Sequence, residues 1–400
     1  MTHADLLIVG AGLAAASLVD ELRDAGDERS VLVVGDEAER PYERPGLSKG
    51  VLLGNDPMES VYVHEADHYA SRSVQTSWDD AVESIDPDNR TARLASGTEV
   101  SYTDLVLATG ATPRRLPIEG MDLPGVHTLR RIPDSAAIKA TFGEGKHLVI
   151  IGAGWIGLEV AAAARQAGTE VTVLEMATVP LAGPLGPQLG EYFGRLHTDH
   201  GVDLRTGMSA AAIEGTDAVT GVRVGMETVP ADAVVVAVGA APNTKLAESA
   251  ELDVDNGILV DERLRAGDNI YAIGDVANAV NTALGERIRV EHWDNAIRQG
   301  KLAARVLVGS DDVYDWQPYF FTDQYDLGME YVGRSTPADE VVTRGDIDSG
   351  EFLAFWLRSG VLTAAMNVNI WDVSDQLREH IGREIDPARL ADPQVPIEDL

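Results

Sequence analysis

Two short glycine-rich segments carry the residue types and spacing that can bind a pyrophosphate group. The first contains Gly10, Gly12 and Ala15, and it follows the apolar run at 6–9 and precedes a helical stretch. The first glycine allows a tight turn, the second lets the backbone approach a pyrophosphate, and the small third residue lets helix and strand pack closely. The phosphates would then lie at the positive end of the helix. This segment therefore predicts a dinucleotide-binding turn.

The same unit recurs in the middle of the chain. The apolar run at 147–151 leads into Gly152, Gly154 and Gly157. One glycine motif is weak evidence because glycine-rich turns are common, whereas two complete copies are strong evidence for two dinucleotide-binding units.

An acidic residue ends the second strand of each unit. Asp36 follows the buried run at 31–34, and Glu175 ends the run that begins at residue 170. A carboxylate at this position accepts a hydrogen bond from a ribose hydroxyl of a bound dinucleotide. Both units therefore contain the turn, the helix and the acid that dinucleotide binding requires.

The elements that position these residues predict an α/β fold. Helices are expected at 16–25 and 161–167, after the two glycine turns. Buried strands that run into Gly–Pro turns close the two halves at 105–114 and 234–243. Because the chain must reverse at such turns, we expect it to cross between domains there.

Inserted strands complete the domain organisation that we expect. Short alternating segments between 79 and 104 and between 203 and 236 predict small antiparallel sheets in each unit. One Rossmann-like dinucleotide-binding domain is therefore expected to interrupt the other. We predict the first domain at 1–113 and 239–316, the inserted domain at 114–238, and a C-terminal α+β domain at 317–400 with strands at 327–333, 351–358 and 361–367.

The composition excludes several kinds of chemistry. The 400 residues contain no cysteine, which rules out a disulfide, a thiolate nucleophile, a cysteine-ligated zinc site and an iron–sulfur cluster of the chain's own. With 65 acidic and 32 basic residues, the net charge of −33 argues against nucleic acid or an anionic membrane as partner. Only five of the basic residues are lysines, which fits either a GC-rich genome or a salt-adapted surface.

Membrane and export signals are not evident. No stretch approaches the roughly 20 apolar residues that span a bilayer. Residues 1–5 carry no basic region of a secretory signal. We therefore expect a cytoplasmic location.

The motifs taken together resemble a known family. They are Pro-Tyr-Glu-Arg-Pro-Gly-Leu-Ser-Lys at 41–49, Ala-Thr-Gly at 108–110, Gly-Ala-Gly-Trp-Ile-Gly-Leu-Glu at 152–159, Tyr-Ala-Ile-Gly-Asp at 271–275 and Glu-His-Trp-Asp-Asn-Ala-Ile-Arg-Gln-Gly at 291–300. The set resembles the FAD-dependent pyridine-nucleotide reductases of the glutathione-reductase superfold. Within these it is most similar to the NADH:ferredoxin reductases that serve haem-thiolate monooxygenases and Rieske-type oxygenases.

The resemblance implies FAD on the first unit and the nicotinamide nucleotide on the second. Asp36 would hold the adenosine ribose, and Asp275 would accept from ribityl or ribose hydroxyls, unless Asp275 is the N-cap of the next helix. The residues expected to bind the two cofactors are Gly10, Gly12, Leu13, Ala14, Ala15, Asp36, Glu37, Arg44, Lys49, Val82, Ala108, Thr109, Gly110, Arg114, Gly152, Gly154, Trp155, Ile156, Gly157, Glu175, Gly239, Gly274, Asp275, Glu291, His292 and Trp293.

The resemblance also implies catalytic roles for Lys49, Glu159 and Trp293. Lys49 would be a cation beside the flavin N5–C4 edge, or else an ordinary surface lysine in a turn that Gly46 loosens by replacing a usual proline. Glu159 would pair with Lys49 or merely complement the helix dipole. Trp155 would be an aromatic gate over the flavin and Trp293 a shield on its exposed side, or both would be core residues.

Two features refine the expected reaction. Glu175 is followed by Met-Ala-Thr-Val, without a cation for a 2′-phosphate, so NADH is preferred over NADPH. Disulfide reductases of this fold need a redox dithiol, and NADH peroxidases need a cysteine near Lys49, where this chain has Ser48. The resemblance therefore implies hydride transfer from NADH to FAD N5, followed by two one-electron transfers to an external two-iron, two-sulfur ferredoxin.

The partner surface is the least determined part of this interpretation. Arg298, Lys301 and Arg305 recur at helical spacing and are a candidate ferredoxin-docking patch, or simply a solvated helix face. Alternative acceptors are rubredoxin and monodehydroascorbate, and an alternative class is an NADH-responsive flavoprotein resembling apoptosis-inducing factor. A monomer or weak homodimer is expected.

Two further expectations concern the C-terminal region. Phe321 stands where the family has a tryptophan, which puts any role of an indole there in doubt. Ile370 and Trp371 are expected to serve packing and not function, and the residues after Asp386 are expected to be loosely ordered.

Overall fold

The computed structural model describes residues 2–400, which divide into two units. The first contains the described residues up to Glu43, together with Glu59–Thr112 and Ala240–Pro318. The second contains Arg44–Met58, Pro113–Gly239 and Tyr319–Leu400. The chain therefore leaves the first unit near the Gly–Pro turn that ends its first half, and returns near the one that ends its second.

The first unit is built on a sheet whose centre is the apolar run at 6–9. Strands β1, β2, β3, β6 and β19 are parallel neighbours in the order β19-β6-β1-β2-β3. The antiparallel strands β4 and β5 extend β6, as the alternating pattern predicted, and β18 pairs with β19 at the other edge. The strands are β1 (Thr2–Val9), β2 (Val31–Val34), β3 (Val74–Ser77), β4 (Val82–Asp86), β5 (Thr91–Leu94), β6 (Glu99–Leu107), β18 (Arg265–Gly267) and β19 (Ile270–Ala272).

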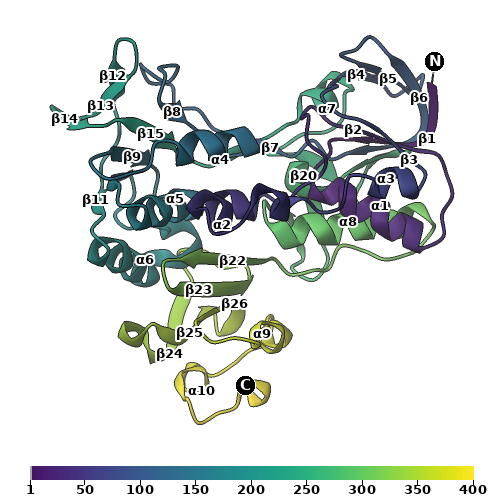
Figure 1. Cartoon of the computed structure of the whole chain (residues 1–400). Helices are drawn as coiled ribbons and strands as arrows, with labels where there is room; N and C mark the ends of the chain where they lie inside the picture. Colours follow the sequence, from purple (N-terminus) through teal and green to yellow (C-terminus); the bar gives the residue numbers. More distant parts are fainter. Residues whose placement is uncertain (1) are drawn as a thin grey trace. The chain divides into compact units, whose positions relative to one another are not determined.

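Two helices of the first unit pack directly on each other. They are α1 (Leu13–Asp24) and α8 (Trp293–Leu307), which lie side by side in Figure 1. A Cβ at Gly300 would lie 2.4 Å from the Ala14 carbonyl oxygen, so the close approach requires glycine. Smaller elements that lie wholly or mostly in this unit are η2 (Met58–Val61), α3 (His68–Ser71), β7 (Ala111–Pro113), β16 (Ala240–Pro242), α7 (Lys245–Ser249), β17 (Ile258–Val260), η3 (Gly274–Val276), β20 (Ala277–Asn281) and β21 (Glu286–Arg289).

The second unit contains a five-stranded parallel sheet in the order β11-β10-β9-β15-β8. Its members are β8 (Val126–His127), β9 (His147–Ile151), β10 (Glu170–Glu175), β11 (Asp203–Thr206) and β15 (Ala233–Val236). The predicted antiparallel insertion is β12 (Ala212–Gly215), β13 (Val219–Val224) and β14 (Glu227–Pro230). The helices are η1 (Pro45–Ser48), α2 (Gly50–Leu53), α4 (Ile132–Lys139), α5 (Trp155–Gln166) and α6 (Ala182–Asp199).

The C-terminal residues form a five-stranded antiparallel sheet in the order β22-β23-β26-β25-β24. The strands are β22 (Tyr319–Gln324), β23 (Leu327–Gly333), β24 (Glu340–Asp346), β25 (Glu351–Arg358) and β26 (Val361–Val368). The strands β24 and β25 are joined by η4 (Ile347–Ser349), and the last strand is followed by α9 (Ser374–His380), α10 (Pro387–Ala391) and η5 (Ile397–Asp399). The three strands predicted here are confirmed within one residue. The domain bounds given above remain a prediction.

Both predicted glycine-turn helices start earlier than expected. α1 begins at Leu13 instead of residue 16, and α5 begins at Trp155 instead of residue 161. The reason is that Gly12 and Gly154 are themselves the N-caps, with extended backbone, so that the last residues of each glycine motif already belong to the helix.

Ile370 packs against the apolar core of the C-terminal domain, as expected, and the Trp371 ring lies against Gly328 although the residue is 56% exposed. The expectation of a loosely ordered chain end was wrong. The residues after Asp386 are held in place, because the Arg344 guanidinium donates hydrogen bonds to the carbonyls of Arg389, Leu390 and Val395. Buried cations and carbonyls satisfy each other in this way when charged residues cannot reach water.

Within residues 2–400, no helix is both long and apolar enough to cross a bilayer.

Candidate functional site

At the first glycine turn, the backbone that follows β1 lies very close to the backbone that follows β6. Gly10 has a φ of +107°, and a Cβ there would lie 2.2 Å from the Ala108 carbonyl oxygen. Gly12 caps α1, and a Cβ built on it would meet nothing within 4 Å. The helix end is therefore open beside Gly12, where a pyrophosphate would lie against the N-terminal amides.

The second turn repeats this geometry. Gly152 has a φ of +106°, and a Cβ there would lie 2.4 Å from the Ala237 carbonyl oxygen. A Cβ at Gly157 would lie 2.1 Å from the Gly152 carbonyl oxygen, which explains the need for a third glycine. Gly154, like Gly12, faces open space.

These observations fit the two dinucleotides that the residues predict. Each turn combines two strand ends in close contact, a helix N-terminus and an open side at the second glycine, which is the cradle that a pyrophosphate needs. The residues that would hold the FAD pyrophosphate are those around Gly10 and Gly12. Those around Gly152 and Gly154 would hold that of the nicotinamide nucleotide.

The two acids differ in their surroundings. Asp36 is exposed just beyond β2, and its neighbour Glu37 accepts a hydrogen bond of 2.6 Å from the Tyr42 hydroxyl. Glu175 accepts from the backbone amides of Ala153 at 2.7 Å and Ala177 at 2.8 Å. The Glu175 carboxylate therefore shapes the second glycine turn itself, beside its predicted contact with ribose.

Asn243 closes the loop that contains Thr109 and Gly110. Its side-chain amide donates to the Thr109 carbonyl at 2.8 Å, and its backbone amide donates to the Gly110 carbonyl at 2.9 Å. The Thr109 hydroxyl donates in return to the Asn243 carbonyl at 2.8 Å. The Ala-Thr-Gly and Gly–Pro motifs of the two halves are thus one structural feature of the first unit.

Gln299 holds the turn that presents Asp275. The buried Gln299 side chain accepts a 2.8 Å hydrogen bond from the Gly274 amide. Asp275 lies within η3, whose N-cap is Ile273, so the alternative that Asp275 caps a helix is wrong. Gly274 has a φ of +73°, a left-handed conformation that favours glycine.

Glu159 is the centre of a buried polar cluster in the second unit. Its carboxylate is 5% exposed and lies 2.5 Å from the Lys49 ammonium. Ser48 donates to its other oxygen at 2.5 Å, and Thr322 donates at 2.6 Å to the oxygen that binds Lys49. The predicted Lys49–Glu159 pair is therefore present. Its catalytic role remains a prediction.

The segment that carries Ser48 and Lys49 is anchored on α4. The Ser135 hydroxyl donates to the Leu47 carbonyl at 2.7 Å, and the Lys139 ammonium donates to the Val51 carbonyl at 3.0 Å. Because backbone contacts fix both sides of Lys49, its ammonium is presented to Glu159 from a defined position.

Aromatic rings occur on the same elements, and one of them contacts the cluster. The Lys49 ammonium lies 5.3 Å from the centre of the Phe321 ring, within the range of a cation–π contact. The Trp155 ring packs against Phe193 at 5.7 Å and Phe320 at 4.8 Å, between ring centres. Trp155 is half-buried, so its contacts allow both the gate and the core interpretation. Burial raises the pKa of Asp323, which the charge of Lys49 opposes.

The other predicted site residues occupy simpler positions. Arg44 donates to the Arg130 carbonyl at 2.5 Å, and the Arg114 amide donates to the Gly239 carbonyl at 2.9 Å. In the first unit, Leu13, Ala14 and Ala15 lie on α1, Val82 on β4, His292 at the N-cap of α8 and Trp293 at its first position, and Glu291 pairs with Arg289 at 2.5 Å. Ile156 is 46% exposed at the start of α5.

Several structurally important residues were not predicted as site residues. Ser48 and Thr322 bind Glu159 from positions 111 and 163 residues away in the sequence, and Gln299 binds Gly274 from 25 residues away. No local pattern relates residues so far apart. A buried glutamine or threonine becomes recognisable only when its partner is known.

The chain matches a known family over most of its length. The description of the pyridine nucleotide-disulphide oxidoreductases matches residues 4–300, and that of the reductase C-terminal domain matches residues 319–400. The chain therefore belongs to the pyridine nucleotide-disulphide oxidoreductases, a family of FAD enzymes that use NAD(P)H.

Individual relatives point to one branch of this family. A probable ferredoxin reductase of Castellaniella defragrans is 39% identical over 368 residues, which cover 91% of this chain and 90% of that protein. Rhodocoxin reductase of Rhodococcus erythropolis is 38% identical over 367 residues, covering 91% and 86%. The crystal structure of the covalent putidaredoxin reductase–putidaredoxin complex superposes with a TM-score of 0.95 at 32% identity, covering 100% of this chain and 98% of that one. These matches confirm the predicted resemblance and the predicted fold class.

Proposed function

We propose that this chain is an NADH:ferredoxin oxidoreductase that passes electrons to a two-iron, two-sulfur ferredoxin of an oxygenase system. The observation that carries the proposal is the cluster around Glu159, which contains the Ser48 hydroxyl and the Lys49 ammonium but no thiol. With no cysteine in 400 residues, this chain cannot relay electrons through a dithiol. The electrons therefore leave from the flavin to an external acceptor.

In this proposal FAD, when bound, supplies a centre that takes up a hydride and releases single electrons. The chain supplies binding, orientation and charge. Lys49 provides a positive charge that stabilises negative charge on the flavin, and Glu159 keeps the ammonium in one position. Thr322 and Ser48 donate two further hydrogen bonds to the carboxylate, which keeps the pair ordered away from water.

Preference for NADH follows from the surroundings of Glu175. Its carboxylate is fixed by two backbone amides at the end of β10, and the next residue, Met176, is 75% exposed. A fixed negative charge with no neighbouring cation in the following residues disfavours a 2′-phosphate.

The docking patch is a finer part of the proposal. Arg298 is paired with Asp294 at 3.2 Å and stacks on the Trp316 ring at 3.6 Å, and Arg305 is paired with both Glu21 and Asp312. The exposed Lys301 lies between them on α8. Because acids compensate the two arginines, we propose that Lys301 contributes most of the electrostatic attraction to an acidic ferredoxin.

A charge reversal tests the docking patch. Lys301→Glu is expected to raise the KM for the ferredoxin at low salt and to leave NADH–ferricyanide turnover unchanged. Lys245→Glu, which makes the same charge change at an exposed position on α7, is the matched control. Equal effects of the two variants would show that only overall charge matters.

The proposed activity is tested by comparing electron acceptors. NADH-driven reduction of cytochrome c should be fast only when a two-iron, two-sulfur ferredoxin is added, and a panel that includes putidaredoxin is the probe. Faster electron transfer to rubredoxin or monodehydroascorbate than to every ferredoxin would reject the proposal. Slow turnover with a long-lived charge-transfer complex would indicate an NADH-responsive flavoprotein. A cytoplasmic monomer or weak dimer is part of the same proposal.

A further inference from the structure

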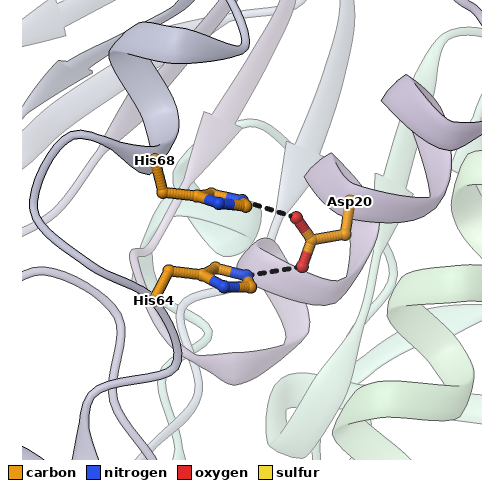
Figure 2. A group of neighbouring side chains, drawn as sticks. All are labelled: Asp20, His64 and His68. Carbon is orange, nitrogen blue, oxygen red and sulfur yellow. Dashed lines mark hydrogen bonds and ion pairs between the residues drawn. The ribbon is translucent and has the colours of Figure 1, made fainter.

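Three side chains of types that bind metal ions meet in the first unit. Asp20 lies on α1, His68 on α3, and His64 in the segment that precedes α3. One Asp20 oxygen is 2.6 Å from His64 Nε2, and the other is 2.8 Å from His68 Nε2. Figure 2 shows the two imidazole rings pointing their Nε2 atoms at the same carboxylate.

The two histidines are held parallel to each other. Their ring centres are 3.6 Å apart, and the angle between the ring planes is 10°. The Tyr69 ring packs edge-on against both, at 5.4 Å from His68 and 6.2 Å from His64. This packing orients the Nε2 atoms side by side before any ligand is present.

We propose that Asp20, His64 and His68 bind one divalent transition-metal ion, with Zn²⁺ as the ion that their chemistry favours. Two imidazole nitrogens and one carboxylate oxygen form a three-residue donor set known from zinc sites with an open fourth position. The candidate ligand atoms all lie within 4.8 Å of one another. The proposal does not depend on the function proposed above.

The geometry requires only a small adjustment. A tetrahedral zinc ion with bonds of about 2.0 Å separates its ligand atoms by about 3.3 Å. The Asp20–histidine distances of 2.6 and 2.8 Å must therefore widen by about 0.5–0.7 Å. Side chains that are 18–24% exposed have room for such a shift.

A surface pocket lies beside the two histidines of the cluster. It has a volume of about 380 Å³ and is lined by both histidines and by Glu59, Glu65 and Asp67, while Asp20 is outside its lining and 24% exposed. The fourth ligand of a tetrahedral ion would be a water molecule, which can reach the histidines from this pocket. The three additional carboxylates make it attractive to cations.

Two arginines near the site carry positive charge that would repel a metal ion, but other contacts hold both guanidinium groups. Arg72 lies 4.0 Å from an Asp20 oxygen, yet its closer partner is Asp24 at 2.7 Å. Arg40 also lines the pocket, with its guanidinium stacked on the Tyr62 ring at 3.6 Å. Carboxylates therefore outnumber the cations around the site.

Binding would connect α1 directly to the segment that carries both histidines. In the metal-free protein this connection is made by the two hydrogen bonds between the histidines and Asp20. A metal ion bound by both Nε2 atoms would take the place of these bonds, with the single proton of each neutral ring on Nδ1. The alternative is that the cluster is only a hydrogen-bonded clamp.

Metal titration of the FAD-containing protein distinguishes these possibilities. The wild-type protein should retain one Zn²⁺ per chain after gel filtration, and Co²⁺ should give the visible absorption of a tetrahedral site. His64→Gln and His68→Gln should each lower zinc affinity at least about tenfold, since loss of a direct ligand exceeds the effect of losing a supporting residue. Glutamine keeps an amide N–H that can donate to Asp20, which protects the fold.

His3→Ala is the matched control. His3 Nε2 lies 3.5 Å from an Asp5 oxygen in the same unit, but no second histidine completes a donor set there within the described residues. This variant should bind zinc like the wild type. If wild type retains no zinc after gel filtration, or if the two glutamine variants retain as much as wild type, the proposal is refuted. If the acidic surface alone bound the zinc, all three variants would retain the same amount of zinc as the wild type.

Discussion

A double-mutant cycle on Glu159 and Lys49 measures how strongly this buried ion pair stabilises the second unit. The two side chains are 5% and 14% exposed and meet at 2.5 Å. Glu159→Ala removes the counterion of Lys49 and the acceptor of two hydroxyls, those of Ser48 and Thr322. The variants required are Glu159→Ala, Lys49→Met and the double variant.

The expected magnitude follows from burial. Breaking a buried pair by removing one partner costs about 3–5 kcal/mol in free energy of unfolding. Because Lys49 keeps some access to water, we expect a loss of about 3 kcal/mol for Glu159→Ala. The double variant leaves no uncompensated charge, so the interaction energy from the cycle should be at least about 2 kcal/mol.

An exposed pair with the same separation is the control. Arg115 and Asp122 also meet at 2.5 Å, but their side chains are 57% and 91% exposed. The same cycle there should give at most about 1 kcal/mol. Urea unfolding of the holoenzyme measures both cycles, and NADH–ferricyanide turnover should fall at least about tenfold in Lys49→Met. A coupling for Glu159–Lys49 no larger than that for Arg115–Asp122 would refute the reasoning.

Further predictions concern the glycine turns and one buried histidine. Gly12→Ala should raise the FAD dissociation constant at least about tenfold without lowering the melting temperature of the apoprotein, because its Cβ meets nothing within 4 Å of the folded chain. Gly154→Ala should instead raise the KM for NADH and keep FAD bound, and reversed effects would contradict the assignment of the two turns. Burial lowers the pKa of His197 to about 4, against its hydrogen bond to Gln324. The stability that His197 contributes is therefore present above pH 6.5 and lost as the pH falls toward 4, by up to about 3 kcal/mol. His197→Gln should reduce the change of the urea midpoint with pH between pH 6.5 and pH 4. If the midpoint of this variant changes with pH as much as that of the wild type, other groups cause the pH dependence.

Local patterns predicted the parts of this protein that are contiguous in sequence. Each glycine turn combines a strand, a turn and a helix within about 20 residues. The order of these residues therefore predicts the tight turns that require glycine at positions 10 and 152. The strands at 327–333, 351–358 and 361–367 were recognised for the same reason. The first residues of the two helices were missed because Gly12 and Gly154 act as N-caps. Which residue becomes the N-cap depends on where the preceding strand ends.

Tertiary structure decided which side chains meet. The motif at 41–49 suggested Lys49, but the hydroxyls of Ser48 and Thr322 join Glu159 from positions that no periodicity relates. The sequence likewise did not predict that the end of the chain packs on Arg344. A polar, proline-rich segment is recognised as ordered only when the donors that bind its carbonyls are known.

The sequence by itself determined the two dinucleotide units, the absence of thiol chemistry and the family. These follow from residue types and short spacings, which act through local sterics and chemistry. Only the tertiary structure placed Asp20 against His64 and His68, 44 and 48 positions away, and buried Glu159 among its three donors. Hydrogen bonds and ion pairs act over about 3 Å, and chain folding alone brings distant residues within that distance.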